Sequence, residues 1–228
     1  MGKAIEMIAL QKGQEILAIM DNEDDWIRNF HKIELADVAI DFSLPATVVN
    51  NIYRFFEAKI PVVVGTTGWS KHFEEVRKVC TDNNQSLFFT PNYSIGVNIL
   101  FALNRKLAEI MQLFPQYDVL IEETHHRQKL DSPSGTAISL ANDIITSIDR
   151  KSRWINEPSA FNNYLEIKSF REDNITCTHN VLYNSEIDTI EIKHAAKNRT
   201  GFAIGAIMAA EWMQDKRGVF SMKDLLNF

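Results

Sequence analysis

The side chains best suited to chemistry are His125, His126, Arg127 and Lys129, which fall within five consecutive positions. A site for a small dicarboxylate needs such positive charge, and histidine can donate a proton near neutral pH. A histidine pair on a solvated loop is the ordinary alternative, and a metal site with Glu122 or Glu123 as the carboxylate is another. Adjacent residues rarely bind one ion together, and the flanking cations would repel it, so we predict no metal.

The same segment runs on through Ser134, Gly135 and Thr136, where a helical pattern begins. The first N–H groups of a helix and its positive end can hold an anion, and glycine lets a carboxylate approach the backbone closely. Ser134 could equally be a plain N-cap of the helix. The turn is therefore a candidate carboxylate cradle beside the histidines.

The first third of the chain must position these residues, and it alternates short apolar runs with helical patterns. Runs that are apolar on both faces are typical of a parallel sheet covered by helices. The predicted strands are 16–20, 38–42, 62–64 and 87–89, and the predicted helices are 4–10, 47–58 and 73–79.

The remainder of the chain changes character. A long helix is predicted over 97–114, a strand over 118–121, a polar loop up to Pro133 and a helix over 134–148. Alternating apolar and polar residues predict successive antiparallel strands at 164–170, 175–183 and 189–194, before a last apolar helix over 201–213. We predict an α/β fold: a Rossmann-like parallel-sheet nucleotide domain, then an α+β domain with a mixed, largely antiparallel sheet.

Composition excludes several classes of function. The formal charge of −6 argues against nucleic acid and acidic membrane surfaces as partners. Cys80 and Cys177 lie in no metal or redox spacing, and we interpret both as packed thiols. No apolar run reaches the length of a spanning helix and no targeting segment is visible, so we expect a cytoplasmic protein.

The segment 122–137, EETHHRQKLDSPSGTA, resembles the E-x-HH-x-x-K-x-D-x-PSGTA signature of 4-hydroxy-tetrahydrodipicolinate reductases. Four further segments are similar to motifs of that family: DFSLP at 41–45, GTTG at 65–68, PNYSIGVN at 91–98 and HAAKNRTGFAIGA at 194–206. The resemblance implies an enzyme of lysine and diaminopimelate biosynthesis. Its reaction would transfer a hydride from NADH or NADPH to a cyclic hydroxy-dicarboxylate, 4-hydroxy-tetrahydrodipicolinate, with loss of water, to give tetrahydrodipicolinate.

The resemblance also implies roles for residues of the central segment. His125 would be the acid/base residue and Lys129 the proton donor. His126 and Lys129 would bind a substrate carboxylate, together with Gly135 and Thr136.

For the cofactor, the resemblance points to turns that follow the parallel strands, where such sheets bind ligands. The implied cofactor-binding residues are Gly2, Asp21, Gly65, Thr66, Thr67, Pro91, Asn92, Tyr93 and Arg199. Gly65 to Thr67 would contact the nicotinamide ribose and amide, Asn92 and Tyr93 would flank the nicotinamide, and Arg199 would lie near substrate or cofactor. A strand-to-helix turn for the GTTG loop and a surface ion pair for Arg199 are the alternatives.

The start of the chain departs from the family pattern. A nucleotide domain of this kind opens with a strand and a glycine-rich turn, and Gly2 matches only the last part of that turn. We expect the true start to lie upstream and Met1 to be an internal methionine; if the truncation is real, we expect weak cofactor binding and poor stability. Asp21, 19 residues after Gly2, suits a ribose hydroxyl and slightly favours NADH, although a solvated turn is an alternative.

The resemblance implies two domains and a homotetramer. Residues 1–94, completed by 200–228, would bind the dinucleotide, and 95–199 would bind substrate and form the oligomer. Two other functions stay open: a nicotinamide oxidoreductase for another small acid, and a truncated, non-catalytic relative that binds a dicarboxylate or serves as a structural subunit.

Overall fold

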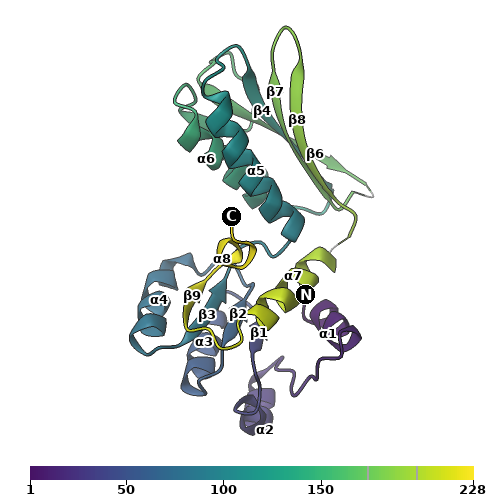
Figure 1. Ribbon diagram of the computed structural model, residues 1–228. Helices are drawn as coiled ribbons and strands as arrows, with labels where there is room; N and C mark the ends of the chain where they lie inside the picture. The colour runs from purple at the N-terminus through teal and green to yellow at the C-terminus, as the bar shows by residue number, and fades with distance from the viewer. Residues whose placement is uncertain (174, 199) are drawn as a thin grey trace. The chain divides into compact units, whose positions relative to one another are not determined.

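The computed structural model describes residues 1–173, 175–198 and 200–228. The chain divides into two compact units, the first made of Met1–Ile95 with Thr200–Phe228 and the second of Gly96–Arg199 (Figure 1). Each unit has a sheet and a core of its own. The α/β fold class, with a parallel sheet followed by a mixed sheet, is confirmed.

The first unit is built on a four-stranded sheet in the order β1-β2-β3-β9. Its strands are β1 (Ala39–Asp41), β2 (Val62–Val64), β3 (Ser86–Phe89) and β9 (Gly218–Phe220), and every neighbouring pair is parallel. All three valines of β2 are buried, as expected of a strand with helices on both faces.

Alternation along the strands divides the core of this unit into two layers. Val63 and Phe88 pack with α1 (Gly2–Gln11) and α7 (Thr200–Trp212), whereas their neighbours Val62 and Leu87 pack with the helices of the opposite face. Those are α2 (Glu23–Ile33), α3 (Val48–Glu57) and α4 (Phe73–Asp82), and the short helices η1 (Ser70–His72) and α8 (Met222–Leu226) complete the unit (Figure 1).

The predicted strand at 16–20 is wrong, because the structure has no strand there. A strand needs a neighbour to pair its N–H and C=O groups, and no strand of the described ranges pairs with this segment. Ile16 still packs against the core, whereas Ile19 is half exposed. The segment leads instead into α2, a helix we did not predict, whose N-cap Asn22 accepts a hydrogen bond from the N–H of Asp25 at 3.0 Å.

The second unit is built on a five-stranded sheet in the order β5-β6-β4-β7-β8. Its strands are β4 (Asp118–His126), β5 (Arg153–Ile155), β6 (Tyr164–Glu172), β7 (Cys177–Asn184) and β8 (Thr189–Ala196). Strands β5, β6 and β4 run parallel, and β7 is antiparallel to both β4 and β8. Helices α5 (Ile95–Met111) and α6 (Gly135–Ser147) cover one face of the sheet (Figure 1).

Two predicted strand arrangements need correction. Residues 164–170 and 175–183 were expected to pair with each other, but β4 lies between β6 and β7 and pairs with both. Strand β4 also runs on to His126 instead of ending at Ile121, because both neighbours supply partners as far as His125. The two histidines therefore lie on a strand in the middle of the sheet and not in a loop.

The apolar side chains of the long helix α5 are only partly buried. Leu100 and Met111 lie in the core, but Ile99, Leu103 and Ile110 are exposed. The buried face of α5 includes Asn104, whose amide donates to the carbonyl of Leu140 at 3.1 Å. A polar residue can occupy this core position because that hydrogen bond satisfies its donor.

Candidate active site

One face of the second sheet changes from apolar to polar along β4. Val119 and Ile121 belong to the core beneath α6, and alternation puts Glu123 and His125 on the same face. Both of these polar side chains are buried. Buried polar groups need hydrogen-bond partners, so we expect other polar side chains to surround Glu123 and His125 at this end of the sheet.

The strand register assembles the site as two rows across the sheet. The first row aligns Ser169, Glu123, His179 and His194 on β6, β4, β7 and β8, and the second aligns Arg171, His125, Cys177 and Ala196. Every member of both rows lies on the helix-covered face, because each is an even number of residues from a core position on its own strand.

Glu123 is the centre of these contacts and is fully buried. Its carboxylate accepts the backbone N–H of Ser134, which lies 3.1 Å from each oxygen, and the hydroxyl of Ser169 at 2.9 Å. The guanidinium of Arg171 lies 3.5 Å from Oε1. Burial raises the pKa of Glu123, but the hydrogen bonds from Ser134 and Ser169 and the charge of His125 outweigh it, so the net pKa is lowered and the side chain is ionised at neutral pH.

His125 lies beside this carboxylate, with Nδ1 3.5 Å from Oε2 of Glu123. Burial lowers the pKa of His125, and the charges of Lys129 and Arg171 lower it further. The charges of Glu123 and Asp131 act in the opposite direction, but the net pKa is lowered. His125 is therefore mostly neutral at pH 7.

His179 is held neutral more strongly. Burial, chiefly, lowers the pKa of His179 to about 3. Its Nε2 lies 3.1 Å from the hydroxyl of Ser134, which also accepts the N–H of Ala137 at 3.2 Å. Which of the two groups donates in the contact between Ser134 and His179 depends on the tautomer of the neutral imidazole.

The start of α6 lies at the edge of this cluster. Ser134 is its N-cap, as one reading of the sequence anticipated, and Gly135 is exposed directly after it. An added Cβ on Gly135 would have no atom within 4 Å, so the space over its backbone is open. Thr136 follows and is half-buried. A carboxylate could approach this turn closely.

Lys129 lies near His125, whereas His126 lies on the opposite face of the sheet. The ammonium of Lys129 contacts both oxygens of Asp131 at 2.8 Å, and the backbone oxygen of Asp131 accepts from Arg171 at 2.6 Å. This ties Lys129 to the end of the sheet that holds His125. His126 alternates onto the opposite face of β4, with Nδ1 3.1 Å from Oε1 of Gln128, so the structure does not bring it together with His125.

A metal is a poor fit to the one group of potential ligands found within the described ranges. Glu123, His125 and His179 offer atoms within 4.8 Å of one another. The carboxylate, however, already accepts two hydrogen bonds and faces Arg171, and Lys129 adds a second cation close by. These charges favour an anion over a cation.

In the first unit, one buried carboxylate ties together the turns after β1 and β2. Asp41 accepts from the hydroxyls of Ser43 at 2.7 Å and Thr66 at 3.0 Å, and from the amide of Asn51 at 2.8 Å. An added Cβ on Gly65 would come within 2.2 Å of the ring of Phe42, so this backbone position requires glycine. The GTTG turn is thereby fixed at the carboxyl end of β2, where parallel sheets bind ligands.

The other predicted cofactor-binding residues of this unit vary in exposure. Tyr93 is buried, and its hydroxyl donates to the carbonyl of Val64 at 2.8 Å, so its ring belongs to the core. Pro91 and Thr67 are exposed, and the side chain of Asn92 accepts the N–H of Ser94 at 2.9 Å. The side chain of Tyr93 is therefore unavailable to a ligand, and its carbonyl packs against Gly205, where an added Cβ would come within 1.8 Å of that oxygen.

Three predicted cofactor-binding residues remain: Gly2, Asp21 and Arg199. Gly2 begins α1, and Asp21 is exposed directly before the N-cap of α2. Arg199 lies outside the described residues.

The side chain of Cys80 is buried, and burial raises its pKa to about 11, which is unsuited to a nucleophile.

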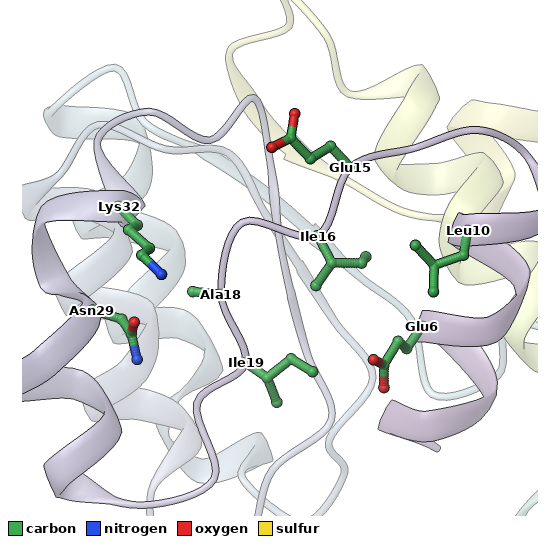
Figure 2. Close-up of a pocket in the computed structure, with 8 residues that line it drawn as sticks. All are labelled: Glu6, Leu10, Glu15, Ile16, Ala18, Ile19, Asn29 and Lys32. Carbon is green, nitrogen blue, oxygen red and sulfur yellow. The ribbon is translucent and has the colours of Figure 1, made fainter.

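A hollow of about 520 Å³ lies elsewhere in the first unit, where α1, the segment 15–19 and α2 meet (Figure 2). It is lined by Glu6, Leu10, Glu15, Ile16, Ala18, Ile19, Asn29 and Lys32. None of the predicted catalytic or binding residues is among them. The hollow is therefore separate from the candidate chemistry.

Sequence reasoning missed the residues that surround His125. Glu123 was considered only as a metal ligand, and Ser169, Arg171 and His179 were not considered. A signal was present, because polar residues occupy positions of alternating strands that should face the core. Recognising it required knowledge of which strands are neighbours.

Two family models together match nearly the whole chain. The model described as "Dihydrodipicolinate reductase, N-terminus" matches residues 1–93, and "Dihydrodipicolinate reductase, C-terminus" matches residues 96–226.

Relatives and solved structures agree with these matches. The chain is 44% identical over 227 residues to the 4-hydroxy-tetrahydrodipicolinate reductase of Christiangramia forsetii, covering 100% of this chain and 94% of that protein. It is 36% identical to the enzyme of that name from Clostridium tetani, over 87% of this chain and 79% of the relative. The fold is similar to dipicolinate-bound dihydrodipicolinate reductase from Paenisporosarcina sp. TG-14, with a TM-score of 0.75, 22% identity, and coverage of 96% and 92% of the two chains.

Proposed function

The chain belongs to the dihydrodipicolinate reductase family, and from that premise we propose how its own residues serve the reaction. It is an oxidoreductase that uses a nicotinamide cofactor to reduce 4-hydroxy-tetrahydrodipicolinate in lysine and diaminopimelate biosynthesis. Among the described residues, no helix combines the length and apolar character needed to cross a membrane.

Substrate binding belongs to the polar end of the second sheet and the start of α6. One carboxylate of the substrate would lie over Gly135 and Thr136 at the positive end of the helix, where the space over Gly135 is open. Lys129 would bind substrate and donate a proton, and His126 would bind a carboxylate once it turns from Gln128. His125 would be the acid/base residue.

Cofactor binding belongs to the turns at the carboxyl ends of β2 and β3. Gly65, Thr66 and Thr67 fit this role because the Asp41 network fixes their backbone at the ligand-binding edge of a parallel sheet. When bound, the nicotinamide supplies a hydride. The protein supplies placement of the substrate ring, charge to match its carboxylates and a source of protons.

The other proposed cofactor-binding residues lie outside the GTTG turn. Pro91, Asn92 and Tyr93 would border the nicotinamide, and Gly2 would border the pyrophosphate. Arg199 would lie near substrate or cofactor. The exposed carboxylate of Asp21 would accept a ribose hydroxyl, which slightly favours NADH over NADPH.

The observation that carries this assignment is the pair of 3.1 Å contacts between the Ser134 N–H and the oxygens of Glu123. They fix the proposed carboxylate cradle to the strand that bears His125. The direct test follows NADH and NADPH consumption with freshly prepared hydroxy-acid, using His125→Asn as the variant and His72→Asn, an exposed histidine of the first unit, as the control. Full activity of His125→Asn would contradict the assignment.

A homotetramer formed through the second unit is part of the proposal. The exposed side chain of Phe170 lies on the face of β6 opposite the helices, and it is an apolar group that a subunit contact could cover. Light scattering on the purified chain should give the mass of four copies. A monomer at micromolar concentration would rule the tetramer out.

A further inference from the structure

One buried carboxylate connects the two parts of the proposed substrate site. Glu123 faces His125 along its own strand, and it also holds the residue that immediately precedes Gly135. We propose that Glu123 is a positioning residue that sets both the proton affinity of His125 and the location of the carboxylate cradle at the start of α6. This inference rests on the proposed function and adds to it a residue that never touches the substrate.

Contacts from the start of α6 and from β6 fix the carboxylate of Glu123 in place. The Ser134 N–H lies 3.1 Å from each carboxylate oxygen, so both oxygens share one backbone donor. Ser169 from β6 holds Oε1 at 2.9 Å, and its own hydroxyl lies 3.0 Å from Oδ1 of Asn156. A carboxylate anchored in this way cannot move without moving the backbone before Gly135, and catalysis is sensitive to shifts of that size.

Charged and titratable groups from several elements face His125. Arg171 on β6 and Lys129 in the loop after β4 are positive, and His179 on β7 is neutral. Cys177 on β7 is the residue directly opposite His125 on that strand. Two carboxylates oppose the cations: Glu123 and Asp131. Asp131 is largely exposed and its oxygens are both bonded to Lys129, whereas Glu123 is fully buried.

Loss of the Glu123 charge would therefore leave His125 buried among cations. A proton on His125 would then lack its buried counter-charge, and the proton affinity would fall. A purely structural role for Glu123 would not produce this result, because loosening the site would expose His125 to water and raise its pKa toward the ordinary value.

Three variants separate these possibilities. Glu123→Gln keeps the size and one acceptor but removes the charge, and Glu123→Asp keeps the charge but shortens the reach to Ser134. Glu122→Gln is the matched control, because Glu122 is the preceding residue and points to the opposite face of β4. Circular dichroism and the unfolding temperature of each variant verify the fold.

The first measurement is the titration of the His125 ring by NMR in the full chain, with the resonance assigned by its loss in His125→Asn. In Glu123→Gln the midpoint should fall by about one pH unit or more, as expected for removal of an adjacent opposite charge. Glu123→Asp and Glu122→Gln should stay near wild type. An unchanged or raised midpoint in folded Glu123→Gln would overturn the proposal.

The second measurement is the pH profile of the reductase reaction. The limb assigned to His125 should move to lower pH in Glu123→Gln, and the KM for the hydroxy-acid should rise on the order of tenfold in Glu123→Asp because the cradle is displaced. If Glu123→Gln does not fold, Glu123→Asp decides: an unchanged KM with a shifted limb would contradict the proposal. Absence of reductase activity in the wild-type chain would defeat the proposed function instead, and the NMR titration would still report on Glu123.

Discussion

Lys129 is the residue at which binding and proton donation can be tested together. Its ammonium is held by Asp131, and its charge acts on His125. Lys129→Met keeps the length of the side chain and removes its charge and protons, so kcat should fall by about 10²–10⁴-fold, the usual contribution of a general acid, and KM should rise. Steady-state kinetics measure both constants.

The control for Lys129 is Arg127→Met, two residues away. Arg127 is exposed, and its Nε lies 3.2 Å from Asp173. Loss of a general surface attraction for an anionic substrate would affect both variants similarly. Equal losses in the two would therefore argue against a specific role for Lys129.

Asp21 is the residue on which the choice of dinucleotide depends. Its side chain is exposed, and its backbone N–H is bonded to Asp25 at 3.1 Å. Asp21→Asn removes a negative charge that would repel a 2′-phosphate, so kcat/KM with NADPH should rise several-fold and kcat/KM with NADH should fall. Asp24→Asn, an exposed neighbour in the first turn of α2, is the control. A clear preference of the wild type for NADPH would refute the idea.

At the scale of elements, Ser134 joins a helix to the sheet. Its hydroxyl caps α6 through Ala137 and contacts His179, and both contacts are buried. Ser134→Ala should lower the free energy of unfolding by about 1 kcal/mol from the lost cap alone, and more because His179 loses a partner. It should also raise the KM for the hydroxy-acid, because the N-cap that holds Gly135 and Thr136 in the first turn of α6 is lost.

Denaturant unfolding and kinetics check both effects of Ser134→Ala. Ser139→Ala is the control, because this exposed hydroxyl of the same helix donates to the carbonyl of Gly135 and belongs to neither the cap nor the histidine cluster. A variant that is destabilised with KM unchanged would mean that the cap serves stability and not the proposed cradle.

The elements that the sequence predicted well are those with a local signal. Strands at 62–64 and 87–89 and the helix at 47–58 were found because apolar runs and a 3.6-residue period are visible without knowledge of neighbours. The predicted strand at 16–20 failed because a strand depends on its partner. The capped start of α2 at Asn22, followed by three acidic residues, was a local signal that we overlooked.

The site was predicted in part for the same reason. His125 and Lys129 belong to one contiguous segment, so they could be found together. Glu123, His179 and Ser169 meet only through strand order, and our expectation that 164–170 and 175–183 pair directly would have kept them apart. Pairwise register is a long-range property that alternation within one strand does not supply.

For the whole molecule, the buried ionisable cluster predicts a loss of stability in acid. His179 has a pKa near 3 when folded and an ordinary value of 6.5, so the unfolded chain binds a proton below pH 6.5 that the folded chain refuses. Glu123, with its pKa lowered, adds a loss that begins as the pH falls through the ordinary carboxyl range. Both contributions have the same sign, so the free energy of unfolding should decrease from about pH 6.5 downward.

His179→Gln tests which group begins this decline. The variant removes the imidazole that stays unprotonated in the folded chain. The decrease in the free energy of unfolding between pH 6.5 and about 5 should therefore become smaller, while the decrease due to Glu123 at lower pH should remain. His72→Gln, at an exposed histidine of the first unit, should leave the whole curve in place. Guanidinium unfolding at a series of pH values gives the curves. If His179→Gln and wild type decline in parallel from pH 6.5, the buried imidazole does not account for the acid sensitivity of the fold.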